Sequence, residues 1–263
     1  MRYLPISIML FFVPLIWSCK SDKPDSSVQS VITDESKPEK YKLTPVSKSP
    51  TYRDASIQSM TYENGRFAFE IGGSSYTLGA QTSDAAGKMC ANSDQGQHIH
   101  LIVDKQPYGA YYTNEFEHPI SNGAHNLLAF LSRSYHESIK TPEARVAKRV
   151  IVENGSFTSS EDIREPMLFF SRPKGTYVGE ETKKILLDFY VLNVELGKDF
   201  KVKVQINGEV KILSEWKPYF IEGLPYGQNS VGIALIYNDG SDVEGSQTSI
   251  LQRITLTEDP LPQ

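Results

Sequence analysis

All five histidines of this 263-residue chain lie between residues 97 and 140. Histidine is the commonest metal ligand in proteins and titrates near neutral pH. His98 and His100 stand two apart in an apolar strand pattern, QHIHLIVD. On an extended strand they share one face with Cα atoms about 7 Å apart, so their rings can share one Zn²⁺ or Cu²⁺ ion. Further ligands would have to come from His118 or His136 in the loops that follow.

The alternative is that these histidines are solvated or hydrogen-bonded without a metal. The sequence has no His-Glu-x-x-His, because position 140 is Lys140, and no Cys-x-x-Cys pair. It also lacks Gly-x-Ser-x-Gly and any phosphate-binding glycine loop. We therefore predict no catalytic residues and no required cofactor, with Zn or Cu at the histidines as a second hypothesis. A third hypothesis is an enzyme whose active-site residues form no recognisable local motif.

Tyrosines and polar side chains around the histidines form a second candidate site. Aromatic rings suit sugar faces or protein interfaces, and the cationic groups suit an anion or a carboxylate-bearing peptide. The competing interpretation is that the aromatics are framework and that the charges form ion pairs at a sheet edge. The candidate binding surface comprises Tyr108, Tyr111, Tyr112, Arg133, Tyr135, His136 and Lys140.

Short alternating strands punctuated by Gly, Pro and Asn predict an all-β sandwich. The histidine strand at 98–104 also has a counterpart at 201–207, an offset of 103 residues. The patterns at 123–127 and 149–152 recur 104 residues later. This near-constant offset across several strands predicts a tandem duplication of one immunoglobulin-like sandwich.

The second copy serves as an internal control for the histidines. It places lysines where the first copy has His98 and His100. Because lysines are almost never buried unpaired, we expect these two histidines to face outward. His125 aligns with Asn229, a residue suited to hydrogen-bonding turn backbone, so we expect it to cap a turn rather than bind metal.

The N-terminus reads as a targeting segment over residues 1–18, whose apolar run is too short to span a bilayer. It ends in LIWSC and resembles a bacterial lipobox, which implies that Cys19 carries the acyl chains. Cys90 is then the one other cysteine, so no internal disulfide is expected. Residues 19–50 are rich in Ser, Lys, Asp, Glu and Pro and predict a flexible tether.

With this lipobox, the QHIHLIVD strand and the segments FLSRSYHES and FSRPKG, the chain resembles lipoproteins of the Bacteroidota with two tandem immunoglobulin-like domains. The resemblance implies fold and an outer-membrane location, on the cell surface or the periplasmic face, and no established activity. The expected boundaries are a signal peptide at 1–18, the lipidated tether at 19–50, sandwiches at 51–160 and 161–258, and a tail at 259–263.

The expected function is that of a non-enzymatic subunit, anchored to the outer membrane, that binds an envelope protein complex or a glycan. The formal net charge of −5, without a basic stripe, argues against a nucleic-acid partner.

Overall fold

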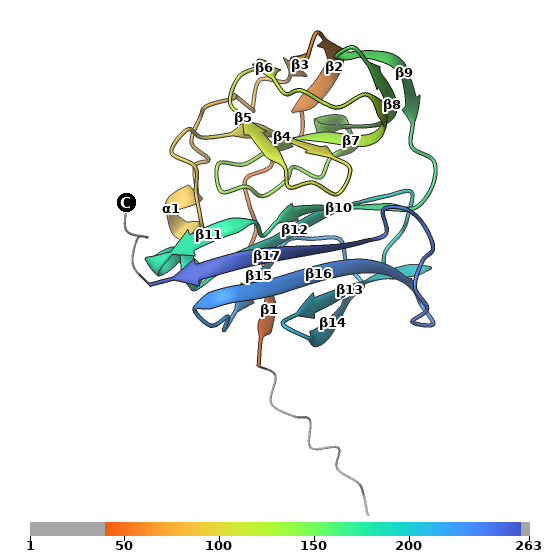
Figure 1. Ribbon diagram of the computed structural model, residues 1–263. Coiled ribbons are helices and arrows are strands. Elements are labelled where there is room, and N and C mark those ends of the chain that lie inside the picture. The colour runs from red at the N-terminus through yellow and green to blue at the C-terminus, as the bar shows by residue number, and fades with distance from the viewer. Residues whose placement is uncertain (1–39, 259–263) are drawn as a thin grey trace, which may run out of the picture. The chain divides into compact units, whose positions relative to one another are not determined.

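The computed structural model describes residues 40–258 of the chain (Figure 1). Their regular structure is almost entirely β-strand, with one four-residue α-helix, α1 (Ala85–Lys88), and two 3₁₀ turns, η1 (Pro142–Ala144) and η2 (Gly179–Thr182). The predicted all-β sandwich class is confirmed. The predicted signal peptide, Cys19 and the predicted C-terminal tail lie outside the described residues. Within 40–258, no helix is long and apolar enough to cross a membrane.

The first half of the fold packs two sheets around an aromatic and aliphatic core that includes Phe67, Phe69, Leu101 and Leu127. One sheet has the order β2-β3-β6 and the other the order β5-β4-β7-β8-β9. The strands are β2 (Ser56–Glu63), β3 (Arg66–Gly72), β4 (His98–Val103), β5 (Gly109–Tyr111), β6 (Glu115–Glu117), β7 (Gly123–Ser132), β8 (Arg145–Glu153) and β9 (Ser156–Asp162).

The second half repeats this plan with sheets ordered β1-β15-β12-β10 and β11-β17-β16-β13-β14. Its core includes Leu187, Phe189, Val204 and Ile233. The strands are β1 (Lys42–Pro45), β10 (Met167–Arg172), β11 (Gly175–Val178), β12 (Ile185–Leu192), β13 (Phe200–Ile206), β14 (Glu209–Leu213), β15 (Tyr219–Glu222), β16 (Gly227–Tyr237) and β17 (Ser249–Thr257).

The aligned segments occupy matching places in the two halves. Strand β4 pairs with β7 as β13 pairs with β16, and each of β4 and β13 is followed by a residue of positive φ, Asp104 at 55° and Asn207 at 47°. The side-chain oxygen of Asp104 accepts from the backbone N–H of Asn126 in β7 at 2.9 Å. That of Asn207 accepts from the backbone N–H of Ser230 in β16 at 2.8 Å. The described residues, 40–258, nevertheless belong to one compact unit, and the predicted domain boundary at 160–161 stays a prediction.

The predicted tether ends earlier than residue 50. Strand β1 pairs antiparallel with β15 of the second half, and Tyr41 beside it is buried. The prediction of a flexible linker is wrong for this segment, because Tyr41 and Leu43 carry enough apolar surface to pack onto the second core.

A third hydrophobic cluster joins the two halves. The face of β4 and β7 that points away from the first core contributes Leu128 and Phe130, and β10 and β12 contribute Phe169 and Tyr190. Every residue of β12 is buried, because its sheet is covered on both faces. The sheet face that carries the histidines is therefore covered as well.

Candidate metal centre

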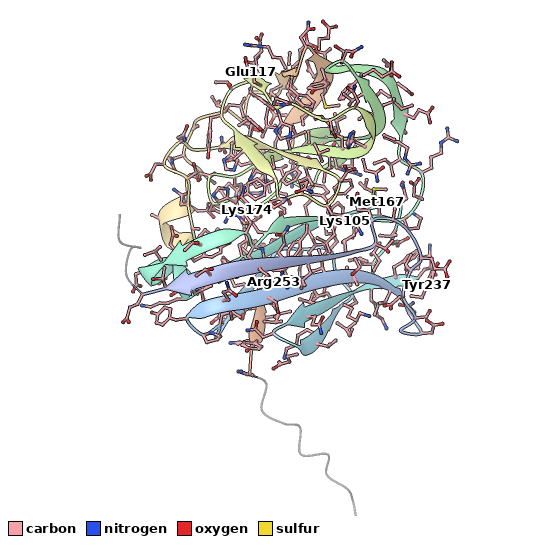
Figure 2. All side chains as sticks on the ribbon, viewed as in Figure 1. Lys105, Glu117, Met167, Lys174, Tyr237 and Arg253 are labelled. Atoms are coloured by element: carbon pink, nitrogen blue, oxygen red, sulfur yellow. The ribbon has the colours of Figure 1, made fainter. Side chains whose placement is uncertain are left out.

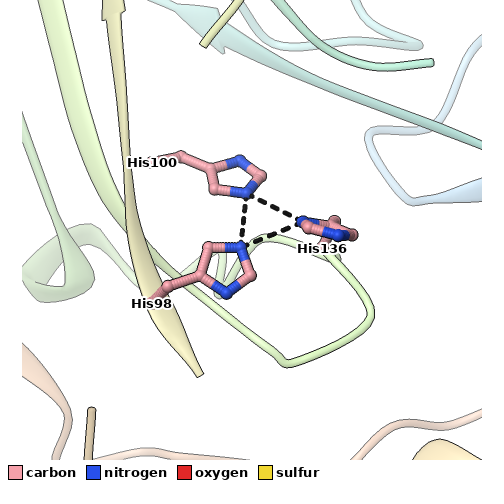
Figure 3. A group of neighbouring side chains, drawn as sticks. All are labelled: His98, His100 and His136. Carbon is pink, nitrogen blue, oxygen red and sulfur yellow. Dashed lines mark hydrogen bonds between the residues drawn. The ribbon is translucent and has the colours of Figure 1, made fainter. Parts of the chain in front are cut away.

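Three imidazole rings meet beneath this cover (Figure 3). The Nε2 atoms of His98 and His100 lie 2.8 Å apart. Nδ1 of His136 lies 3.0 Å from Nε2 of His98 and 3.4 Å from Nε2 of His100. His98 and His100 are 0% exposed and His136 is 9% exposed. Three nitrogens thus converge on one point inside the protein.

Strand parity and a left-handed turn position these rings. His98 and His100 lie on the face of β4 opposite Ile99 and Leu101, which enter the first core. His136 follows β7 in a turn closed by its own N–H donating to the carbonyl of Arg133 at 2.9 Å. Its φ of 67° is a left-handed conformation that few non-glycine residues adopt. This turn directs the third ring back toward the strand.

The expectation that His98 and His100 face solvent is wrong. Their face of the strand was predicted correctly, but the second half of the fold covers it. The corresponding Lys201 and Lys203 are only partly buried on β13, and Lys203 pairs with the exposed Asp242 at 2.6 Å. The sequence repeat therefore predicts which residues share a face of the strand but not whether another sheet covers that face.

The proton position on His98 follows from its neighbours. Its Nδ1 lies 2.7 Å from the carbonyl oxygen of Gly96. A carbonyl can only accept, so Nδ1 carries the hydrogen and Nε2 presents a lone pair to the cluster. Nδ1 of His100 lies 3.1 Å from Oγ of Ser171 on β10. Such contacts to the second ring nitrogen are typical of metal-binding histidines, since they fix the tautomer and ring orientation.

The cluster is neutral at pH 7. Burial lowers the pKa of His98 to about 4, although the Gly96 carbonyl opposes this, and the positive charges of Arg172 and Lys174 add to the effect. Burial lowers the pKa of His100 and His136 well below the ordinary value, and the neighbouring histidines and the charges of Arg172 and Lys174 add to the effect. Neutral imidazole is the form that binds a metal ion.

The triangle of nitrogens has nearly the size that a metal requires. Ligand nitrogens about 2.0–2.1 Å from a tetrahedral zinc ion are separated by about 3.3 Å. The observed separations of 2.8 to 3.4 Å need only a small outward movement of the rings. Among residues 40–258, these three form the group of histidine, cysteine and acidic side chains with suitable metal-binding geometry.

The other two histidines lie outside this group. Nδ1 of His118 is 2.6 Å from the hydroxyl of Tyr111, so the prediction of His118 as a ligand is wrong. Nδ1 of His125 bonds Asp104 at 2.7 Å, and its Nε2 bonds the carbonyl of Ser121 at 2.9 Å. Asn229 makes the equivalent contact in the second half, where it accepts from Asn207 at 2.7 Å. The expected turn-capping role of His125 is what the structure shows.

The predicted binding surface is mostly interior. Tyr108, Arg133, Tyr135 and His136 are buried. Tyr108 stacks on His100 with ring centroids 3.7 Å apart. The prediction that these side chains form an exposed surface is therefore wrong. The sheet that contains β10 and β12 and the segment before β2 cover them.

The charged residues of that set hold segments together. Arg133 pairs with Glu137 at 3.0 Å and donates to the carbonyl of Pro50 at 2.6 Å. Lys140 pairs with the fully buried Asp188 of β12 at 2.8 Å. Ion pairs were the competing interpretation for these charges, and the pairs lie in the interior rather than at an exposed edge.

Of the remaining tyrosines, Tyr111 stacks on Phe116 with centroids 3.5 Å apart. Tyr112 places its ring 5.0 Å from that of His98, and its hydroxyl lies 2.7 Å from Oγ of Ser93. Both are half-buried. Tyr112 thus belongs to the wall of the histidine cluster.

Sequence reasoning missed the contribution of the second half. Ser171, Arg172 and Lys174 all come from the segment FSRPKG, which was noted only as part of a resemblance. Its concentration of polar residues at the end of the buried strand β10 was the available signal.

Comparisons with known proteins give limited likenesses. No family model matches the chain, and no curated protein matches it. Among solved structures, the fibronectin(III)-like modules of Clostridium thermocellum CbhA are 14% identical, with 84% of this chain and 97% of that one covered, at a TM-score of 0.29. The Bacteroides ovatus mixed-linkage glucan utilization locus protein SGBP-B, solved with a mixed-linkage heptasaccharide, is 13% identical, with 82% of this chain and 48% of that one covered, at a TM-score of 0.19. At such scores neither likeness bears on the function of this chain.

Proposed function

We propose that this protein binds a transition-metal ion of the zinc or copper type through His98, His100 and His136. The observation that carries the proposal is the convergence of three buried imidazole nitrogens on one point, within 3.4 Å of one another. Imidazole is a preferred ligand of zinc and copper.

Hydrogen bonds among the three rings alone leave this cluster incompletely satisfied. The Gly96 carbonyl fixes His98 with a lone pair at Nε2. If His100 and His136 both present N–H groups, two donors compete for one lone pair and face each other at 3.4 Å. If only His100 presents an N–H, the lone pairs of His98 and His136 face each other at 3.0 Å, and the Tyr108 hydroxyl, 3.3 Å from Nδ1 of His136, can donate to the latter. A cation at the centre satisfies all three nitrogens, which supports a bound metal over a purely hydrogen-bonded cluster.

The proposal places this metal site in an envelope protein without catalytic function. Attachment through Cys19 to the outer membrane is part of the proposal and rests on the lipobox in the sequence. An envelope complex or glycan as partner stays a prediction, and the side chains first proposed for it are largely interior. Such a partner would have to bind elsewhere on the protein.

The experiment measures metal on the untagged chain, because a histidine tag would supply competing ligands. The mature protein is purified without chelators, and zinc and copper are quantified by mass spectrometry. The chelator-treated protein is then titrated with each ion. We expect one ion per chain, with loss of binding in His98→Gln, His100→Gln and His136→Gln.

The chain supplies its own controls. His118→Gln and His125→Asn each remove an imidazole outside the cluster and should leave the stoichiometry unchanged. Circular dichroism distinguishes loss of ligand from loss of fold, and His136→Gln is the mildest variant because its ring lies on a turn. Wild-type protein that is folded and binds neither ion would refute the proposal.

A further inference from the structure

We infer that the cluster favours a monovalent ion, copper(I), over divalent zinc; this rests on the proposed metal site. The reason is the charge around the cluster. Among the described residues with suitable geometry, the ligand group contains three neutral histidines and no carboxylate. Two cationic side chains of the second half, Arg172 and Lys174, lie close by.

Arg172 is a buried cation without a carboxylate partner. Its side chain is 7% exposed, and it forms no ion pair with any acidic group of residues 40–258. One guanidinium nitrogen donates to the hydroxyl of Tyr177 at 3.0 Å, and Nε has no hydrogen-bond partner. The guanidinium carbon lies 5.4 Å from the centroid of the Tyr108 ring.

Lys174 approaches the same tyrosine. It lies where the second half meets the first (Figure 2). Its Nζ donates to the carbonyl of Tyr108 at 2.6 Å and lies 3.8 Å from the ring centroid. The same ring stacks on His100, with ring centroids 3.7 Å apart. Lys174 Nζ is therefore within about 7.5 Å of the His100 ring, and the Arg172 carbon within about 9 Å.

Fixed positive charges oppose a bound ion in proportion to its charge. The electrostatic penalty for a divalent ion is twice that for a monovalent ion at the same position. Burial adds to this difference, since removing an ion from water costs more as its charge rises. Three neutral nitrogens at the corners of a triangle suit copper(I), which accepts three-coordinate sites. Zinc prefers four ligands, and its sites are commonly completed by an anionic ligand or water.

The test compares one monovalent and one divalent probe on the same protein. Silver(I) stands in for copper(I) because it is not oxidised in air, and zinc is the divalent probe. Affinities are measured by competition with chelators of known strength, with copper(I) repeated anaerobically. The variants are Lys174→Met, which removes a charge from a half-buried position, and Lys198→Met, an exposed lysine that serves as the control.

We expect wild-type protein to bind silver(I) and copper(I) more tightly than zinc. Lys174→Met should strengthen silver(I) binding about tenfold and zinc binding about a hundredfold, because the logarithm of the change scales with ionic charge. Lys198→Met should change neither. Tighter binding of zinc in the wild type, or equal gains for both ions in Lys174→Met, would overturn the inference while the metal site stands. Absence of binding by every ion would instead refute the site itself.

Discussion

Lowering the pH should destabilise the metal-free protein between pH 6.5 and 4, and His98 sets a minimum size for the effect. Burial lowers the pKa of this histidine from 6.5 to about 4. The unfolded chain therefore binds a proton at a higher pH than the folded protein. The stability associated with neutral His98 is complete above pH 6.5 and is lost as the pH falls toward 4.

The magnitude follows from the difference between the two pKa values. For His98 alone, the free energy of unfolding should fall by about 2 kcal/mol from pH 7 to pH 5 and by about 3 kcal/mol at pH 4. The pKa values of His100 and His136 are lowered in the same direction, so the measured loss should exceed this minimum. Most carboxyl groups titrate below pH 5, which leaves the upper part of the window to histidine.

Urea denaturation of the chelator-treated protein at pH 7, 6 and 5 tests this directly. His98→Gln is the matched comparison, because it removes one titrating ring and should reduce the slope by up to about 1.4 kcal/mol per pH unit. Bound metal should raise the free energy of unfolding but leave this slope in place, because metal-bound histidines of the folded protein take up no protons while those of the unfolded chain do. A free energy of unfolding that is constant to within about 0.5 kcal/mol from pH 7 to pH 5 would refute the assignment of neutral, buried histidines.

Three further substitutions or measurements test other parts of the structure. Asp188→Ala should lower the free energy of unfolding, measured by urea denaturation, by about 3–5 kcal/mol, because it leaves the Lys140 ammonium without its buried partner. As the control, Lys203→Met breaks an exposed ion pair and should lower it by about 1 kcal/mol or less. His125→Asn, which introduces the residue found in the second copy, should leave the melting temperature nearly unchanged, and a large drop would contradict a simple capping role. Partial burial raises the pKa of Cys90 to about 12, so alkylation at pH 8 should be at least about ten times slower than that of an exposed cysteine, and equal rates would contradict the raised pKa.

The strands and their matching positions in the two halves were predictable because they depend on local patterns. Apolar alternation placed Ile99 and Leu101 in the first core, and Val202 and Val204 occupy the same positions in the second. The pairing of His125 with Asn229 followed from alignment alone. These features are set by side-chain parity and by turn chemistry, which each half determines for itself.

The environment of the histidines was not predictable from the same patterns. The burial of His98 and His100 depends on β10 and β12, which lie about seventy or more residues away in sequence and cover this face of β4 and β7. No local signal specifies that contact. Residues 133–138 were misread for the same reason: a polar sequence normally indicates a surface, and here its hydrogen bonds are completed by distant segments such as Pro50 and Asp188.

The residues on the covered face of β4 and β7 distinguish a packing role from a functional role. Other residues of β4 and β7 on this face, Ile102, Leu128 and Phe130, are apolar and belong to the cluster that joins the halves. Burial alone would favour apolar side chains at positions 98 and 100 as well, because a buried polar group costs free energy unless it is hydrogen-bonded. His98 and His100 depart from that pattern together, and the left-handed turn at His136 adds a third ring to the same point. Packing does not require this combination, and three converging imidazole nitrogens are a donor set suited to a metal ion, which supports the proposed site.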